Sequence, residues 1–262
     1  MVQAAERRTK MSEFLKTALL AASCADEISM KYFRNDVAVE IKPDQSPVTV
    51  ADRETERVII ATIKADFPDH GFLGEETGKS SNSSDYVWII DPIDGTKNFI
   101  RNIPLFGTQI ALMHKDKLIV GVSSMPAIGE LLYAANGEAF LNGKSVRVSD
   151  NSELAQSAIS FAGLNRWPEY IPQANLFSLF SSIDRVRAFG DCYPFHLVAT
   201  GRLEAVVQSM IHIWDIAALV AIIEAAGGKC TDFSGDQIGI DSTNLLASNG
   251  EIHYQILDYL KP

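Results

Sequence analysis

The sequence predicts a mixed α/β protein of two closely fused lobes, and three patterns support this prediction. Apolar residues recur at helical spacing near the N-terminus, β-rich runs follow, and strands alternate with helices after about residue 150. We expect residues 1–150 to form an N-terminal α+β lobe and residues 151–262 to form a C-terminal α/β lobe. A chain of 262 residues buries enough apolar surface to fold without disulfide or metal staples.

The first expected helix covers residues 12–33. Its segment Lys16–Cys24 is apolar and resembles a secretion signal, but the apolar stretch is short and Asp26 and Glu27 follow at once. Helical spacing of apolar residues continues beyond it, which favours an amphipathic helix. We therefore expect a cytoplasmic protein, and no segment approaches the ~20 apolar residues of a membrane span.

The remaining elements follow in chain order. A second helix is expected over residues 50–66, begun by the segment Ser46–Thr49. Lys115–Lys117 and Asn142–Gly143 indicate turns between strands. Strands are expected at residues 87–91, 109–114, 118–123 and 130–135, and the second lobe should alternate strand 157–162, helix 170–182, strand 184–189, helix 193–200, strand 204–208 and helix 214–226.

Composition excludes some classes of function. The net charge of −10 opposes nonspecific binding to nucleic acid, which requires Lys and Arg to neutralise phosphates. Cys24, Cys192 and Cys230 have neither the paired spacing of a disulfide framework nor the CxxC spacing of a zinc site. We expect them to be packing residues in a reducing compartment.

The segment Trp88–Phe99 is the most informative for function, because an apolar strand ends there in two carboxylates. Asp91 and Asp94 lie on either side of the Ile93 carbonyl, in a turn stiffened by a proline, and together could bind one divalent cation. The alternative is an ordinary Asp-rich turn in which the side chains cap local backbone.

Gly95 and Thr96 follow these carboxylates directly. Their backbone N–H groups could receive a phosphate oxygen while metal ions neutralise its other side. The pattern therefore predicts metal-assisted hydrolysis of a phosphate ester.

Two further segments place acids where apolar elements begin or end. Phe72–Thr77 runs from apolar residues into Glu75, and Trp214–Ala218 opens an apolar helix with Asp215 in its first turn. An acid at a helix start commonly serves the helix dipole alone, which is the alternative for Asp215.

These segments together resemble the inositol monophosphatase superfamily. The resemblance rests on Gly74–Glu76, Asp91–Phe99, Trp214–Ala218 and Glu224–Gly228, and it covers the chain from about residue 14 onward. It implies a layered α-β-α-β-α sandwich of the inositol monophosphatase and fructose-1,6-bisphosphatase type, with the active site where the lobes meet. It also implies a Mg²⁺-dependent phosphomonoesterase that forms a homodimer.

The resemblance further implies a role for each acidic residue. Glu75, Asp91 and the Ile93 carbonyl would hold one Mg²⁺, and Asp91, Asp94 and Asp215 would hold a second. It allows a third, weaker ion near Glu75. This two-metal arrangement activates the attacking water and stabilises the departing oxygen.

The catalytic residues implied by the resemblance are Thr96, Asp52 and Glu75. Thr96 and Asp52 would form a hydrogen-bonded pair that orients and deprotonates the attacking water, without a covalent phospho-enzyme. Asp52 has an alternative role as an acid at a helix N-terminus. Gly95 and Thr96 would bind the phosphate.

Segments between these motifs look most like the histidinol-phosphate phosphatase branch, namely Lys42–Arg53, Pro68–Gly71 and Phe189–Tyr193. The substrate residues implied are Asp191, Cys192, Gln208 and His212. Asp191 would pair with the ammonium of histidinol phosphate, although a loop cap is an ordinary alternative. Gln208 departs from both branches, where an acid is common, and His212 could instead be a surface or capping group.

Three competing functions remain open on the sequence. The substrate could be an inositol phosphate or a related small phosphate monoester with the chemistry unchanged. Relatives that bind a second phosphate should carry more basic residues around the pocket, and no such cluster is visible in the sequence. The chain could also act as an interaction protein of a transcription complex, although the retained acids favour catalysis.

Overall fold

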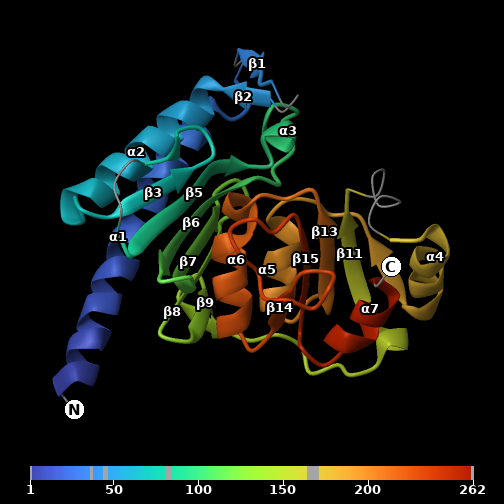
Figure 1. Cartoon of the computed structure of the whole chain (residues 1–262). Helices are drawn as coiled ribbons and strands as arrows, with labels where there is room; N and C mark the ends of the chain where they lie inside the picture. Colours follow the sequence, from blue (N-terminus) through green and yellow to red (C-terminus); the bar gives the residue numbers. More distant parts are fainter. Residues whose placement is uncertain (1, 36–37, 44–46, 81–83, 164–170, 261–262) are drawn as a thin grey trace.

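The computed structural model describes the chain except residues 1, 36–37, 44–46, 81–83, 164–170 and 261–262 (Figure 1). Its described residues form a layered sandwich of two sheets and three helical layers. The predicted α/β fold class and layered architecture are confirmed.

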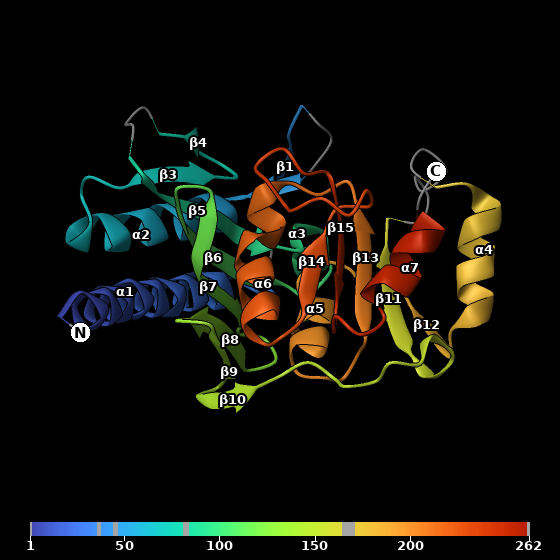
Figure 2. The same cartoon turned by 60° about the horizontal axis from the view of Figure 1, so that its bottom comes forward.

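The first layer consists of α1 (Val2–Tyr32) and α2 (Val50–Asp66), which pack on one face of an eight-stranded sheet (Figure 2). The sheet order is β10-β9-β8-β7-β6-β5-β3-β4. Its strands are β3 (Gly71–Gly74), β4 (Gly78–Lys79), β5 (Tyr86–Asp94), β6 (Gly107–His114), β7 (Lys117–Met125), β8 (Glu130–Ala135), β9 (Glu138–Leu141) and β10 (Lys144–Val146). A separate ribbon of β1 (Val39–Ile41) and β2 (Pro47–Thr49) precedes α2, and the short α3 (Thr96–Phe99) follows β5.

The second sheet has five strands in the order β12-β11-β13-β15-β14. β11 pairs in parallel with β12 and β13, whereas β15 is antiparallel to both of its neighbours. The strands are β11 (Ala158–Ala162), β12 (Arg185–Arg187), β13 (Ala205–Ser209), β14 (Lys229–Thr231) and β15 (Asn244–Ser248). The helices of this half are the 3-10 turn η1 (Leu154–Gln156), α4 (Gln173–Ser182), α5 (Tyr193–Ala199), α6 (Ile213–Ala225) and α7 (His253–Leu260).

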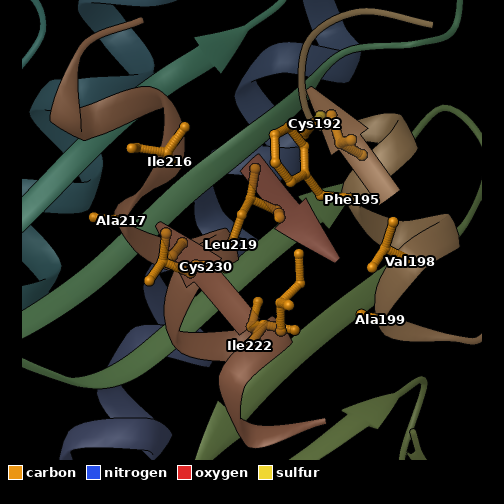
Figure 3. Close-up of a cluster of buried hydrophobic side chains, with 14 of the residues drawn as sticks. Cys192, Phe195, Val198, Ala199, Ile216, Ala217, Leu219, Ile222 and Cys230 are labelled. Atoms are coloured by element: carbon orange, nitrogen blue, oxygen red, sulfur yellow. The ribbon is translucent and has the colours of Figure 1, made fainter. Parts of the chain in front are cut away.

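The helices α5 and α6 form the middle layer between the two sheets. Their apolar side chains, among them Phe195, Leu219 and Ile222, form one buried cluster with residues of both sheets (Figure 3). α6 lies so close to the first sheet that a Cβ on Gly121 of β7 would be 2.4 Å from the Ala218 carbonyl oxygen. A strand residue without a side chain is therefore required at this crossing.

The strand β5 is buried on both faces. Trp88 and Ile90 point into the core beneath α1 and α2, and Ile89 points toward α6. This continuous burial explains why the strand is apolar throughout rather than alternating. The acidic end of β5 lies near Asp215 in the first turn of α6.

Most predicted elements occur near their expected positions. The helix over residues 50–66 is found as predicted, and Asn142 and Gly143 adopt positive φ angles of 48° and 79° in the turn before β10. α1 begins earlier than predicted, at Val2. No strand was predicted for β1–β4, β9, β10, β14 or β15, which are short runs without a clear period. The helix α7 was not predicted either, although its buried residues Ile256, Leu257 and Leu260 have helical spacing.

No helix in the described part of the chain is long and apolar enough to cross a membrane. Cys24, Cys192 and Cys230 are free thiols, and the latter two are buried. Cys192 and Cys230 pack in the core as the sequence predicts, whereas Cys24 is only partly buried.

Candidate active site

The end of β5 bends out of regular pairing. Its register with β6 shifts between Asp91 and Asp94, and the Ile93 N–H donates to Asp91 Oδ1 at 3.0 Å. The Thr108 hydroxyl donates to the Pro92 carbonyl at 2.8 Å and holds the bend. Asp91 and Asp94 are only 2% and 7% exposed, so both carboxylates are buried at the end of an apolar strand.

Glu75 comes to the same place because β3 runs parallel to β5. Gly74 pairs with Ile90, and the Glu75 N–H donates to the Ile90 carbonyl at 3.1 Å. The carboxyl ends of neighbouring parallel strands lie at one edge, where ligands commonly bind. Glu75 and Asp91 are in side-chain hydrogen-bond contact.

The turn that carries Glu75 is anchored by a buried acid of α2. Glu56, which is 0% exposed, accepts the N–H groups of Glu76 and Thr77 at 2.9 Å each. A Cβ on Gly74 would lie 2.4 Å from the Glu56 carboxylate, which explains glycine there. The sequence analysis did not assign Glu56, although an acid on the inward face of an amphipathic helix is a signal that could have found it.

Asp215 reaches the cluster from the first turn of α6. Its Oδ2 accepts the His212 N–H at 2.8 Å, so it caps the helix, and its carboxyl group is also in hydrogen-bond contact with Asp91. Asp215 therefore both caps α6 and lies beside Asp91.

The three aspartates of this cluster have perturbed pKa values. Burial, followed by repulsion from neighbouring carboxylates, raises the pKa values of Asp91 and Asp94 well above their ordinary range. Burial likewise raises the pKa of Asp215 to about 7. The Lys42 ammonium contacts Glu75 at 2.8 Å and also pairs with Glu76. Lys42 was not predicted as part of the site.

These residues fit a hard divalent cation. Asp94 Oδ2 is buried without a hydrogen-bond partner among the described residues, and carboxylate oxygen is the donor that Mg²⁺ prefers. Across the described ranges, no group of at least three His, Cys, Asp or Glu side chains is already arranged to hold a metal. A cation at Glu75 would compete with the Lys42 ammonium for its carboxylate.

Thr96 and Asp52 meet as the resemblance implied. The Thr96 hydroxyl lies 3.2 Å from Asp52 Oδ1 and 3.0 Å from the Ile93 carbonyl. Asp52 Oδ2 accepts the N–H and hydroxyl of Thr49, so this acid also completes a capping box at the start of α2. Burial raises the pKa of Asp52, although the hydrogen bonds from Thr49 lower it.

Gly95 stands between the acids and α3. Its φ of 86° is in the left-handed region, and a Cβ there would lie 3.1 Å from both Asp191 Oδ2 and the Leu105 carbonyl oxygen. Only glycine fits both the backbone angle and the space. The Gly95 and Thr96 N–H groups stand at the first turn of α3, where helices leave backbone donors free of internal partners.

The predicted substrate residues differ in their access to this site. Asp191 faces Gly95, accepts the Asn98 side-chain amide at 2.8 Å and has a φ of 56°, and burial raises its pKa to about 6. Gln208 is half-buried, with an Oε1 that has no partner in the described part of the protein. His212 is exposed and stacks on Trp214 at 4.6 Å between ring centroids.

Cys192 requires a correction to its predicted substrate role. It is 0% exposed, packs among the core residues in Figure 3 and is in hydrogen-bond contact with Asp94. Because it follows Asp191 at the start of α5, its side chain turns into the core while Asp191 turns toward Gly95. A substrate contact is therefore not available to it in this structure.

The family model described as the inositol monophosphatase family matches residues 10–261. The chain belongs to the inositol monophosphatase family. It is 41% identical over 245 residues to a histidinol-phosphatase of Chlorobaculum parvum. The alignment covers 91% of this chain and 93% of that relative. It is 32% identical over 253 residues to human inositol monophosphatase 1, and the alignment covers 92% of this chain and 91% of the human protein.

Solved structures agree with this assignment. An inositol monophosphatase (IMPase) of Thermotoga maritima superposes with a TM-score of 0.86 at 33% identity, covering 95% of this chain and 96% of the other. Family membership identifies the chain as a phosphoric monoester hydrolase and accounts for the shared layered fold. Enzymes of this family are generally metal-dependent.

The raised carboxyl pKa values predict how stability depends on pH without metal. A group with a raised folded-state pKa binds its proton more tightly when folded, so its contribution is present below its unfolded pKa of about 4 and is lost as pH rises. We expect the melting temperature of the metal-free protein to fall between pH 4 and the pKa of about 7 of Asp215. Melting curves in EDTA across this range measure the fall.

Added Mg²⁺ should reverse most of this loss at pH 8, because the bound cation offsets the repulsion that deprotonation creates. Asp215→Asn should flatten the decline in EDTA. A metal-free melting temperature that rises from pH 4 to pH 7 would contradict the prediction.

Proposed function

We propose that the protein is a Mg²⁺-dependent phosphatase that hydrolyses L-histidinol phosphate to L-histidinol and inorganic phosphate. The observation that carries this proposal is the cluster of Glu75, Asp91, Asp94 and Asp215 beside the Gly95 turn, in which Asp91 and Asp94 are buried. Buried acids of this kind are costly unless cations neutralise them. The similarity to a histidinol-phosphatase over most of both chains supports the substrate class.

Two Mg²⁺ ions would be held by these acids. Glu75, Asp91 and the Ile93 carbonyl would bind the first, and Asp91, Asp94 and Asp215 the second, with room near Glu75 for a third. When bound, the ions would activate the attacking water and neutralise charge on the phosphate.

The residues of the chain orient the reactants around these ions. The Thr96 hydroxyl, held at 3.2 Å from Asp52, would direct the attacking water and pass its proton toward Asp52. The raised pKa of Asp52 suits it to accept that proton. The N–H groups of Gly95 and Thr96 would bind the phosphate oxygens.

Asp191 would recognise the ammonium group of histidinol phosphate. It faces the phosphate-binding turn from the start of α5 and is held in place by Asn98, so its carboxylate is preorganised. Charge-assisted pairing of a carboxylate with an ammonium is stronger than a neutral hydrogen bond. Gln208 and His212 lie on the elements that lead to Asp215, where they would border the imidazole end of the substrate.

We further propose that the protein is a cytoplasmic homodimer. The family resemblance implies the dimer. The absence of a spanning helix from the described residues is compatible with this setting. Analytical ultracentrifugation at several protein concentrations measures the assembly state.

The deciding experiment compares L-histidinol phosphate with myo-inositol 1-phosphate in Mg²⁺-dependent phosphate release. We expect kcat/KM to favour histidinol phosphate by at least ~100-fold, about 2.7 kcal/mol of differential transition-state binding. Asp191→Asn should reduce kcat/KM for histidinol phosphate by ~10- to 100-fold and change the value for inositol phosphate far less. A wild-type preference for inositol phosphate would overturn the substrate and leave the metal residues as proposed.

A further inference from the structure

A groove lies between α2 and the β3–β4 hairpin. This groove has a volume of about 530 Å³, which is within the range of small-molecule sites. Three cationic side chains of α2 line it, namely Arg53, Arg57 and Lys64. The turn that follows Glu75 also lines it and contributes one acid, Glu76, together with Thr77.

The three cations form a row along one face of α2. Spacings of four and seven residues place side chains on the same side of a helix. Arg53 pairs with the exposed Glu40, but among the described residues neither Arg57 nor Lys64 forms an ion pair with a carboxylate. The one acid of the groove, Glu76, pairs with Lys42 outside it, so Arg57 and Lys64 leave a local excess of positive charge in a chain of net charge −10.

The floor of the groove is apolar. Phe72 is 3% exposed overall and Ile60 is half-buried, and both line the hollow. The Lys64 ammonium lies 5.3 Å from the centre of the Phe72 ring. A ligand that enters would therefore meet an apolar surface below and cations along one side, which is the pattern that binds an amphiphilic anion.

We propose that this groove is a ligand site for a small organic anion with a flat apolar body, its acidic group held by Arg57 and Lys64. Arg57 offers a planar fork that matches a carboxylate or sulfonate, and Lys64 adds a second positive charge. The apolar body packs against Ile60 and Phe72.

The groove shares a wall with the candidate active site. Glu56 precedes Arg57 on α2, and its carboxylate holds the N–H groups of Glu76 and Thr77 at 2.9 Å each. The same turn carries Glu75. A ligand beside Arg57 therefore shifts the position of Glu75 and changes the affinity of the metal site. This coupling, unlike the ligand site itself, rests on the proposed metal site.

The site is tested with 1-anilinonaphthalene-8-sulfonate as an anionic probe and its neutral analogue N-phenyl-1-naphthylamine. Fluorescence titration of the metal-free protein should show one tight site for the anionic probe and at least ~10-fold weaker binding of the neutral probe. The double variant R57E/K64E should weaken binding of the anionic probe by at least ~10-fold.

The matched control is K144E/R147E, which makes the same change of net charge at exposed residues of the β10 region. It should leave binding of the anionic probe within ~2-fold of the wild-type value. Circular dichroism and melting curves check that both variants are folded. Equal affinity for both probes, or an equal loss in both double variants, would overturn the site.

The coupling is measured by titrating Mg²⁺ calorimetrically with and without saturating anionic probe. Because linkage is reciprocal, the probe should shift the Mg²⁺ dissociation constant, and Mg²⁺ should shift probe affinity by the same factor. We expect at least ~3-fold. Unchanged Mg²⁺ affinity would overturn the coupling, whereas a protein that binds the probe but no Mg²⁺ would instead overturn the proposed metal site.

Discussion

Asp94→Asn should lower Mg²⁺-dependent phosphate release by at least ~10³-fold, which corresponds to about 4 kcal/mol of transition-state stabilisation. Asp94 Oδ2 is buried without a partner in the described structure, so it is the oxygen most available to a cation. The amide keeps the shape of the side chain and removes its charge. Initial rates of phosphate release at saturating Mg²⁺ and substrate measure the loss.

The same substitution should not weaken the metal-free fold. Burial and neighbouring carboxylates raise the pKa of Asp94 well above its ordinary range, so a neutral amide relieves repulsion. We expect a melting temperature in EDTA at pH 8 equal to or above that of the wild type. The control is Asp150→Asn, whose carboxylate is 93% exposed, and it should change neither quantity. Full activity of Asp94→Asn would refute the assignment of Asp94.

Gly121→Ala should lower the free energy of unfolding by about 2 kcal/mol, within the range for overpacked cores. A Cβ at Gly121 would lie 2.4 Å from the Ala218 carbonyl oxygen and 3.0 Å from the Ala221 Cβ, and a helix backbone has little room to retreat. Urea denaturation followed by circular dichroism measures the change.

Gly121→Ala should also lower the rate of Mg²⁺-dependent phosphate release by ~10-fold or more, because small displacements at an active site are costly. The displaced element is α6, and its first turn carries Asp215. Gly239→Ala is the matched control, because its added Cβ would meet no atom within 4 Å and its φ is not positive. If Gly121→Ala behaves like Gly239→Ala, α6 and β7 are less tightly packed than described.

Much of the fold follows from local patterns in the chain. The helix at residues 50–66 has a strong apolar period and a capping residue, Thr49, and it was found with the predicted bounds. The strands β14 and β15 escaped prediction because each is short and takes its stability from neighbours rather than from its own period. The helix α7 was missed although the spacing of its buried residues is helical. The pairing of β3 beside β5 is similarly non-local, and sequence spacing does not reveal it.

The candidate site likewise has features that the local sequence predicts and features that long-range packing sets. The sequence by itself determined the order of the acids, the glycine after Asp94 and the apolar strand before Asp91, because residue type and short spacing set these local properties. Family resemblance then grouped residues that lie far apart in the chain.

Only the tertiary structure decided which groups meet. It buried Cys192 in the core, placed Asp191 against Gly95, and showed that Lys42 and Glu56 support the Glu75 turn. The physical reason is that burial and long-range contact depend on how the sheets and α6 pack, and packing is a property of the whole chain. The carboxyl pKa values follow from that burial, so no reading of residue types alone could supply them.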